Sequence, residues 1–316
     1  MSPPLPAYGR SQTVEVDGPV HCLDMGGPED GPLLIGVHGL GGSHLNWSAV
    51  GPRLSQSCRV LAVDLVGHGL TPRGTRTADL EGHRRLVSGF LQAIGGRPAI
   101  LVGNSMGGLV SALEAADAPD RVSGLVLIDP ALPMARPGLI HPRVLTNFVL
   151  CAVPGVGERY LSARRKRTTA EQTVMRVLGT TCVDPSRVPP EVVEAHIRLT
   201  EEVDRKLGDG AYLTSARSLS WLMARPGPTL SRIAKVQAPV LHLHGERDVL
   251  IPLAAARRMA EGRTDWRLEV ARDIGHAPML EAPVWTGLRI QEWLDVRLPG
   301  AGGGDRHEAG AGSPVS

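Results

Sequence analysis

The stretch Ile100-Leu-Val-Gly-Asn-Ser-Met-Gly-Gly-Leu-Val110 places one hydroxyl residue between glycines, where a run of apolar, β-prone residues stops. In a tight turn from a strand into a helix, the apex residue takes an uncommon backbone conformation, and its neighbours two places away approach closely. Gly103 and Gly107 occupy those two places around Ser105. A hydroxyl at the apex projects clear of the sheet's C-terminal edge, and the helix that begins after it points free N–H groups toward developing negative charge. The pattern predicts a nucleophilic Ser105; the alternative is a serine that only caps the helix.

Short apolar runs surround this turn, and the stretches between them are long enough for crossover helices. Such runs predict the strands of a parallel sheet, because these strands are buried on both faces. An Asp-Gly pair at 17–18 predicts an antiparallel hairpin before them. The expected strands are Thr13–Val16, Val20–Leu23, Leu33–Val37, Val60–Val63, Ala99–Val102, Leu125–Ile128, Val240–His244 and Arg267–Val270. The expected helices of this part are Trp47–Leu54, Thr77–Ile94, Ser105–Ala116, Leu253–Ala260 and Val284–Leu294.

The alternation stops after Asp129-Pro130 and resumes about a hundred residues later. The amphipathic stretches in this interval are Arg143–Cys151, Ala170–Leu178 and Glu191–Leu207. Their spacing predicts helices, and prolines and glycines separate them. The C-terminal residues are rich in Gly, Ala and Ser and have nothing to bury, which predicts disorder. The predicted division is a core of residues 1–132 and 234–298, a helical cap of residues 133–233 and a disordered tail of residues 299–316.

Composition limits the classes of function. With 316 residues, 42% hydrophobic content and a formal net charge of +2, the chain can bury a large core and has no overall charge that favours nucleic acid. The segment MSPPLPAYGR lacks the basic and apolar regions of a signal peptide, and no long apolar window follows, so we expect a cytoplasmic protein. The cysteines lack metal-ligand spacing, and we expect reduced, mostly buried thiols at Cys22, Cys58, Cys151 and Cys182.

Three further segments offer the partners that a nucleophilic serine requires. His38-Gly-Leu-Gly-Gly42 follows a strand, and its glycines let backbone amides turn toward a neighbouring strand end. Asp248 follows the expected strand Val240–His244, at the sheet edge where ligands of open α/β folds bind. His276 lies in Ile274-Gly-His-Ala-Pro278, after the last expected strand. Ser, Asp, His is one of the chain orders in which catalytic triads occur.

With these segments, the sequence resembles the α/β-hydrolase family from Thr13 to about Leu298. The matching motifs, in the family's order, are HGLGG at 38–42, DLVGHG at 64–69, GNSMGG at 103–108, GERD at 245–248 and GHAP at 275–278. The resemblance implies an α/β-hydrolase fold. This fold has a mostly parallel eight-stranded sheet flanked by helices, with a helical cap inserted after the sixth strand.

The resemblance also implies roles for individual residues. Ser105 corresponds to the nucleophile, His276 to its general base and Asp248 to the acid that orients the imidazole. The backbone amides of Leu40 and Met106 correspond to the oxyanion hole. These roles predict a serine hydrolase that cleaves a carboxylic ester of a small or medium apolar substrate through an acyl-enzyme. No cofactor, metal or nucleic acid is expected.

Alternatives remain for several of these residues. Asp129 ends the expected strand Leu125–Ile128 at the same sheet edge and is the alternative to Asp248 as the acid. The basic run Arg164-Arg-Lys-Arg167 is interpreted as a solvated helix face, with contact to an anionic membrane as the less favoured reading. Cap residues that could line an apolar pocket entrance, or simply pack on the core, are Leu145, Phe148, Val149, Leu150 and Val153.

Other histidines and Asp64 are interpreted as structural. His38 and His68 lie in loops and are expected to form local hydrogen bonds. His242 and His244 share one face of a strand but lack a third ligand at metal-binding spacing, which favours a core or hydrogen-bonding role. Asp64 is expected to accept backbone N–H bonds from the loop after it.

Two other functions remain open. The spelling GNSMGG also resembles C–C bond hydrolases of ring-cleavage products, but the tryptophan expected after their catalytic histidine is missing from Ala277-Pro278-Met279-Leu280. A non-catalytic binding protein of the same fold is the third hypothesis.

Overall fold

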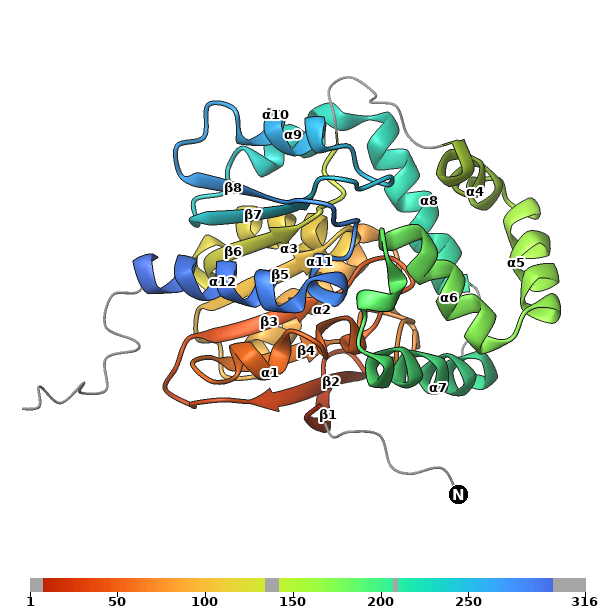
Figure 1. Cartoon of the computed structure of the whole chain (residues 1–316), viewed down its shortest axis with the longest axis horizontal. Coiled ribbons are helices and arrows are strands. Elements are labelled where there is room, and N and C mark those ends of the chain that lie inside the picture. The colour runs from red at the N-terminus through yellow and green to blue at the C-terminus, as the bar shows by residue number, and fades with distance from the viewer. Residues whose placement is uncertain (1–7, 134–141, 207–209, 298–316) are drawn as a thin grey trace, which may run out of the picture.

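The structure is a computed structural model that describes residues 8–133, 142–206 and 210–297. These residues form one sheet of eight strands with helices on both faces (Figure 1). The strands are β1 (Arg10–Glu15), β2 (Pro19–Gly26), β3 (Leu33–Val37), β4 (Arg59–Val63), β5 (Ala99–Asn104), β6 (Val122–Ile128), β7 (Val240–Gly245) and β8 (Trp266–Ala271). Their order is β1-β2-β4-β3-β5-β6-β7-β8. The pairs β1–β2 and β2–β4 are antiparallel, and the other neighbours run parallel.

The predicted fold class is confirmed. Each expected strand overlaps an observed one, and β3 matches its expectation at both ends. The hairpin between β1 and β2 turns through Asp17 and Gly18, which have φ values of 49° and 115°. A left-handed backbone of this kind favours Gly and Asp, which explains the Asp-Gly signal in the sequence.

Alternate residues of the central strands pack on different helices. Leu33 and Ile35 belong to one core cluster, whereas Leu34 belongs to the other. The first cluster includes side chains of α2 (Leu80–Ala93) and α3 (Met106–Asp117), and the second includes side chains of α1 (Gly51–Leu54) and α12 (Pro283–Arg297). Because side chains alternate across a strand, a sheet covered on both faces requires unbroken apolar runs.

Between β6 and β7 the described residues form helices and no strand. These are α4 (Pro142–Ala152), α5 (Val156–Arg167), α6 (Ala170–Thr181), the 3₁₀ turn η3 (Pro185–Arg187), α7 (Pro190–Lys206), α8 (Gly210–Ala224) and α9 (Pro226–Ile233). Helices α4 to α8 lie together at one end of the sheet (Figure 1). The predicted amphipathic stretches fall on α4, α6 and α7, while the sequence did not single out α5, α8 or α9 as separate helices.

The extent of a cap domain over residues 133–233 stays a prediction, and the predicted tail at residues 299–316 lies outside the described residues. The remaining elements are the 3₁₀ turns η1 (His44–Trp47) and η2 (Pro119–Arg121) and the helices α10 (Leu253–Ala260) and α11 (Pro278–Glu281).

The four cysteines have the surroundings expected from the sequence. Cys22, Cys58, Cys151 and Cys182 are all free and buried, as expected. Within the described ranges, every helix is too short or too polar to cross a bilayer.

Candidate active site

Ser105 forms the turn between β5 and α3. Its φ of 54° and ψ of −120° lie in a region that residues other than glycine rarely adopt. The backbone holds this conformation from both sides. Ser105 N donates to Ile128 O at 3.0 Å, and Ala131 N donates to Ser105 O at 2.9 Å. The end of β6 and the residues after it therefore fix the apex of the turn.

The glycines around Ser105 are required by close backbone packing. A Cβ atom on Gly103 would lie 2.6 Å from Gly107 O, and a Cβ atom on Gly107 would lie 2.1 Å from Val37 O. Both clashes are with backbone atoms, which cannot swing aside as a flexible side chain could. The two glycines approach each other as the sequence pattern predicts.

His276 and Asp248 form a hydrogen-bonded pair beyond the ends of β7 and β8. His276 Nδ1 lies 2.6 Å from Asp248 Oδ2. Asp248 Oδ1 accepts backbone N–H bonds from Leu250 at 2.7 Å and Ile251 at 3.0 Å. Burial would raise the pKa of Asp248, but neighbouring His276 and the hydrogen bonds hold it below its ordinary value. Since an ionised carboxylate only accepts, Nδ1 carries the proton and Nε2 can accept one.

Ser105 and His276 line the same pocket, which has a volume of about 380 Å³. Leu40 also lines it, and Met106 begins α3 directly after Ser105. The backbone N–H groups of Leu40 and Met106 donate no hydrogen bond to another described residue, so both can serve an incoming oxygen. Within the described residues no hydrogen bond joins Ser105 Oγ to the His276 ring, and such bonds are often long before substrate binds.

Asp129, the alternative acid, lies beside Asp248 at the end of β6. Its Oδ1 accepts from Gly245 N at 2.9 Å, while its Oδ2 has no partner among the described residues. Complete burial, and then the negative charge of Asp248, raise the pKa of Asp129 well above its ordinary value. The geometry therefore pairs His276 with Asp248, and the opposite pKa shifts favour an ionised Asp248 beside a neutral Asp129.

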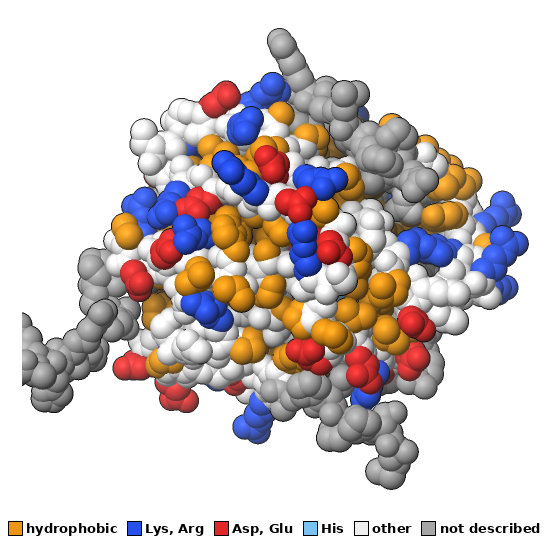
Figure 2. Space-filling model, in the orientation of Figure 1, with side chains coloured by type: hydrophobic (Ala, Val, Ile, Leu, Met, Phe, Trp, Pro, Cys, Tyr) orange, Lys and Arg blue, Asp and Glu red, His pale blue; other side chains and the backbone are white. Residues whose placement is uncertain are grey.

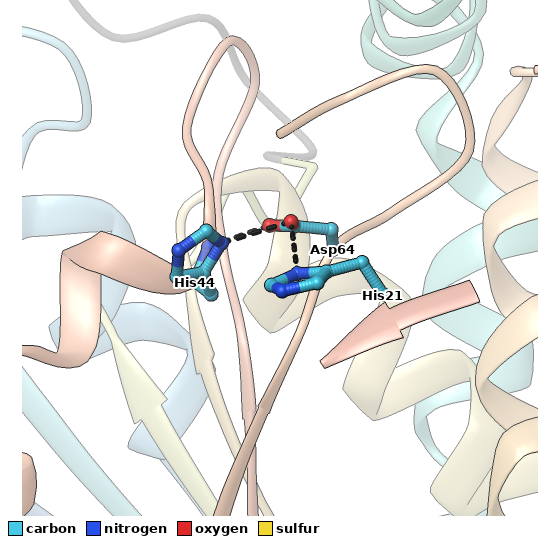
Figure 3. Close-up of side chains that lie close together, drawn as sticks. All are labelled: His21, His44 and Asp64. Atoms are coloured by element: carbon cyan, nitrogen blue, oxygen red, sulfur yellow. Dashed lines mark hydrogen bonds and ion pairs between the residues drawn. The ribbon is translucent and has the colours of Figure 1, made fainter. Parts of the chain in front are cut away.

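A second cluster of histidine and aspartate does not line this pocket. His21 Nδ1 and His44 Nδ1 lie 2.8 and 2.9 Å from Asp64 Oδ2, on separate sides of the carboxylate (Figure 3). Asp64 also accepts from the backbone N–H of His44 at 2.6 Å and of Leu70 at 2.8 Å. The bond to Leu70 agrees with the predicted bracing of the loop after Asp64. Burial alone would raise the pKa of Asp64, but the two imidazole hydrogen bonds lower it.

The other histidines have mostly structural surroundings. His38 Nε2 accepts from Leu65 N at 3.0 Å and its Nδ1 donates to Gly39 O at 2.8 Å, while burial lowers its pKa to about 4. His242 is buried, with its pKa lowered by burial to about 3, and His244 Nε2 donates to Ile251 O at 3.0 Å. His68 differs, because it both donates to Val66 O and lines the pocket.

Helices α5 to α8 supply pocket residues that the sequence interpretation missed. Tyr212 of α8 packs on the loop of Leu40, since a Cβ on Gly41 would lie 3.2 Å from Tyr212 Cε2. His196 of α7 also lines the pocket, and its Nδ1 donates to Val192 O at 2.8 Å. Neither residue stands in a recognisable motif.

The interpretation of Arg164–Arg167 as one solvated face is wrong. Arg164 and Arg165 are half-buried and line the pocket, whereas Lys166 and Arg167 are exposed. Leu161 and Thr168 line it too, so the pocket residues of α5 follow the i, i+3, i+4, i+7 spacing of one helix face. That spacing was present in the sequence.

Of the two readings given for the apolar residues at 145–153, core packing holds for Phe148. Leu145, Val149 and Val153 are exposed and lie outside the pocket lining, so a pocket entrance formed by them is wrong.

Comparisons with known proteins place most of the chain beside several relatives. The chain is 30% identical over 279 residues to the dihydrolipoyllysine-residue acetyltransferase component of the acetoin cleaving system of Pseudomonas putida. That alignment covers 86% of this chain and 65% of the relative, so the chain spans slightly less than two thirds of that protein. It is 29% identical over 275 residues to a pimeloyl-[acyl-carrier protein] methyl ester esterase of Aromatoleum aromaticum, with 83% of this chain and 97% of the relative covered.

A solved structure of a membrane phospholipase A superimposes with a TM-score of 0.71 at 27% identity, covering 92% of this chain and 87% of that one. Residues 32–283 match the family model described as an alpha/beta hydrolase fold. This match spans most of the sequence, and the chain therefore belongs to the α/β-hydrolase family.

Proposed function

We propose that this protein is a serine hydrolase that cleaves carboxylic esters through an acyl-enzyme. The observation that carries the proposal is the 2.6 Å contact between His276 Nδ1 and Asp248 Oδ2, made by a histidine that shares a pocket with Ser105. This contact favours the tautomer with the proton on Nδ1, which leaves Nε2 free to accept a proton. The esterase among the curated relatives supports the same reaction class.

In the proposed reaction, Ser105 Oγ forms a bond to the ester carbonyl carbon while its proton passes to His276 Nε2. The backbone N–H groups of Leu40 and Met106 hold the negative oxygen of the tetrahedral intermediate. The bond to the alcohol oxygen then breaks, and His276 gives that oxygen the proton. A water molecule then attacks the acyl-enzyme and gives a proton to His276. The bond to Ser105 Oγ breaks, Oγ regains its proton from His276, and the carboxylic acid is released.

The strained turn serves this chemistry. Ser105, with its backbone held at φ 54°, directly precedes the first N–H group of α3. A donor that is already in place needs no reorganisation when charge develops, and one such donor is worth about 3 kcal/mol in a serine protease of another fold.

The pocket supports an apolar substrate body. Val174 and Leu178 of α6 and Leu199 of α7 belong to its lining. A volume of about 380 Å³ fits a small or medium ester rather than a large polymer.

A fluorophosphonate probe and a series of simple methyl esters test the proposal. The intact protein should become labelled at Ser105 and should release acid from at least one ester, whereas Ser105→Ala should do neither. Labelling and turnover that survive in Ser105→Ala, with unchanged thermal stability of the variant, would show that another residue carries the reaction. A ring-cleavage diketone assayed beside the esters separates ester hydrolysis from C–C bond hydrolysis.

A further inference from the structure

Helix α5 divides its basic run between two surroundings. Arg164 and Arg165 line the pocket that contains Ser105, and Lys166 and Arg167 lie among the exposed residues of the opposite face. Lys and Arg side chains are visible at the edge of the molecule where α5 lies (Figure 2). The position of each basic residue around the helix therefore determines whether its side chain can contact a substrate in the pocket.

Arg164 has no protein counter-ion within the described residues. Its side chain takes part in no ion pair or hydrogen bond there, although it is half-buried. Arg165 is engaged by another group of the protein, so the inference rests on Arg164. Among the described residues that line the pocket there is no aspartate or glutamate. A half-buried cation without a partner has lost part of its hydration, which an incoming anion can replace.

Arg164 shares the pocket with Tyr212, which connects it to the reaction site. Burial raises the pKa of Tyr212, and the positive charge of Arg164 acts against this rise. Tyr212 in turn packs on Gly41, next to the proposed oxyanion donor at Leu40. Arg164 thus lines the same pocket as the loop that would hold the ester carbonyl.

We propose that the ester substrate carries an anionic group, a carboxylate or a phosphate, at the end away from the scissile bond, and that Arg164 binds this group. The inference deepens the proposed esterase function and rests on it. A guanidinium offers paired N–H donors that match the oxygens of either anion. Val174, Leu178 and Leu199 supply an apolar wall for the chain between the ester and the anion.

Two matched pairs of esters test this, with acid release as the readout. Monomethyl adipate and methyl hexanoate differ only in an anionic group on the acyl side. The acetate ester of hydroxyhexanoate and hexyl acetate differ only in one on the alcohol side. For at least one pair, the intact protein should show a kcat/KM about tenfold higher for the anionic ester. The acetate ester of hydroxyhexyl phosphate, assayed beside them, decides between carboxylate and phosphate.

The variants locate the effect. Arg164→Gln should remove the preference, so that kcat/KM becomes about equal for the two esters of the pair, and Arg164→Lys should retain part of the preference. Arg167→Gln is the matched control, because it removes a cation from the exposed face of the same helix. Its preference should equal that of the intact protein.

The outcomes separate the two proposals. Neutral esters that are cleaved without any anionic preference, or a preference that survives in Arg164→Gln, would overturn the inference and leave the esterase intact. If no ester is cleaved but Ser105 is labelled by fluorophosphonate, adipate should slow the labelling at a lower concentration than hexanoate does, and only when Arg164 is present. A failure of both labelling and cleavage would remove the proposed function and the inference together.

Discussion

Among the described residues, Asp248 and Asp64 each form a hydrogen bond to histidine Nδ1, and the two sites differ in what surrounds the imidazole. Asp248 holds one imidazole, that of His276, at 2.6 Å, and this ring lines a pocket beside Ser105. Asp64 holds two imidazoles at 2.8 and 2.9 Å and two backbone N–H groups, and none of the three side chains lines that pocket. Both carboxylates are deeply buried and both have a lowered pKa.

The two sites show that a hydrogen bond between aspartate and histidine Nδ1 can be purely structural or can belong to a reaction site. A carboxylate that binds imidazole Nδ1 fixes the tautomer and orientation of the ring in either setting. What makes His276 a candidate base is that its ring reaches the space where a substrate can lie. In the Asp64 cluster, Nε2 of His21 is already within 2.8 Å of Ser11 Oγ. A short His–Asp contact alone therefore does not identify a triad.

The largest expected effect is on Asp248. Asp248→Asn should lower kcat for an ester substrate about 10⁴-fold, because an amide in place of the carboxylate stabilises the wrong imidazole tautomer. The thermal midpoint should shift by only a few degrees, since Asn can still accept the backbone N–H bonds of Leu250 and Ile251. Steady-state kinetics and thermal unfolding of the same preparation measure both. A variant that keeps most of its kcat would assign the acid to another residue.

Asp64→Asn should lower stability strongly and kcat only slightly, the reverse of Asp248→Asn. Four donors point at the carboxylate, and an amide presents N–H groups to some of them, so we expect a loss of about 3 kcal/mol in the free energy of unfolding. The kcat of the folded protein should fall less than about tenfold. Urea denaturation and kinetics at about pH 7 measure the two quantities. A large loss of kcat in a stable variant would mean that the cluster takes part in the reaction.

The pH dependence gives a second readout for Asp64. Its pKa is lowered in the folded protein, so its stabilising contribution is present above the unfolded pKa of about 3.9 and is lost as the pH falls toward the folded pKa. The stability difference between the intact protein and Asp64→Asn should therefore shrink as the pH falls below about 4. A difference that stays unchanged between about pH 4 and pH 2 would contradict the assigned charge state.

The sequence was most informative where local chemistry decides the structure. Gly103 and Gly107 signal a turn because no Cβ atom fits there, and the position of Ser105 follows from these two contacts. Asp248 and His276 each follow a strand, and parallel strands end at one sheet edge, so their meeting follows from topology. The catalytic roles given to these residues remain predictions.

The sequence was least informative for the inserted helices. Only the helical spacing of its residues indicates which face of α5 lines the pocket. The run of four basic residues was interpreted as one solvated face instead. The apolar residues of α4 have a helical pattern as well, yet Leu145 and Val149 are half or more exposed, at 50% and 54%, because nothing among the described residues covers them. Which helix faces meet is decided by packing between separate segments, and one sequence does not record those partners.

The smallest expected effect concerns Asp129, the carboxyl beside the His276–Asp248 pair. Its raised pKa favours the neutral form, and Asp129→Asn keeps a neutral group and the oxygen that accepts from Gly245 N at 2.9 Å. We expect kcat within about threefold of the intact protein. An acid with a raised folded pKa costs stability as the pH rises above about 3.9, and Asn removes that cost. The variant should therefore be equally or slightly more stable at about pH 7, in urea denaturation beside Asp248→Asn. A kcat loss matching that of Asp248→Asn would instead make Asp129 the acid of the triad.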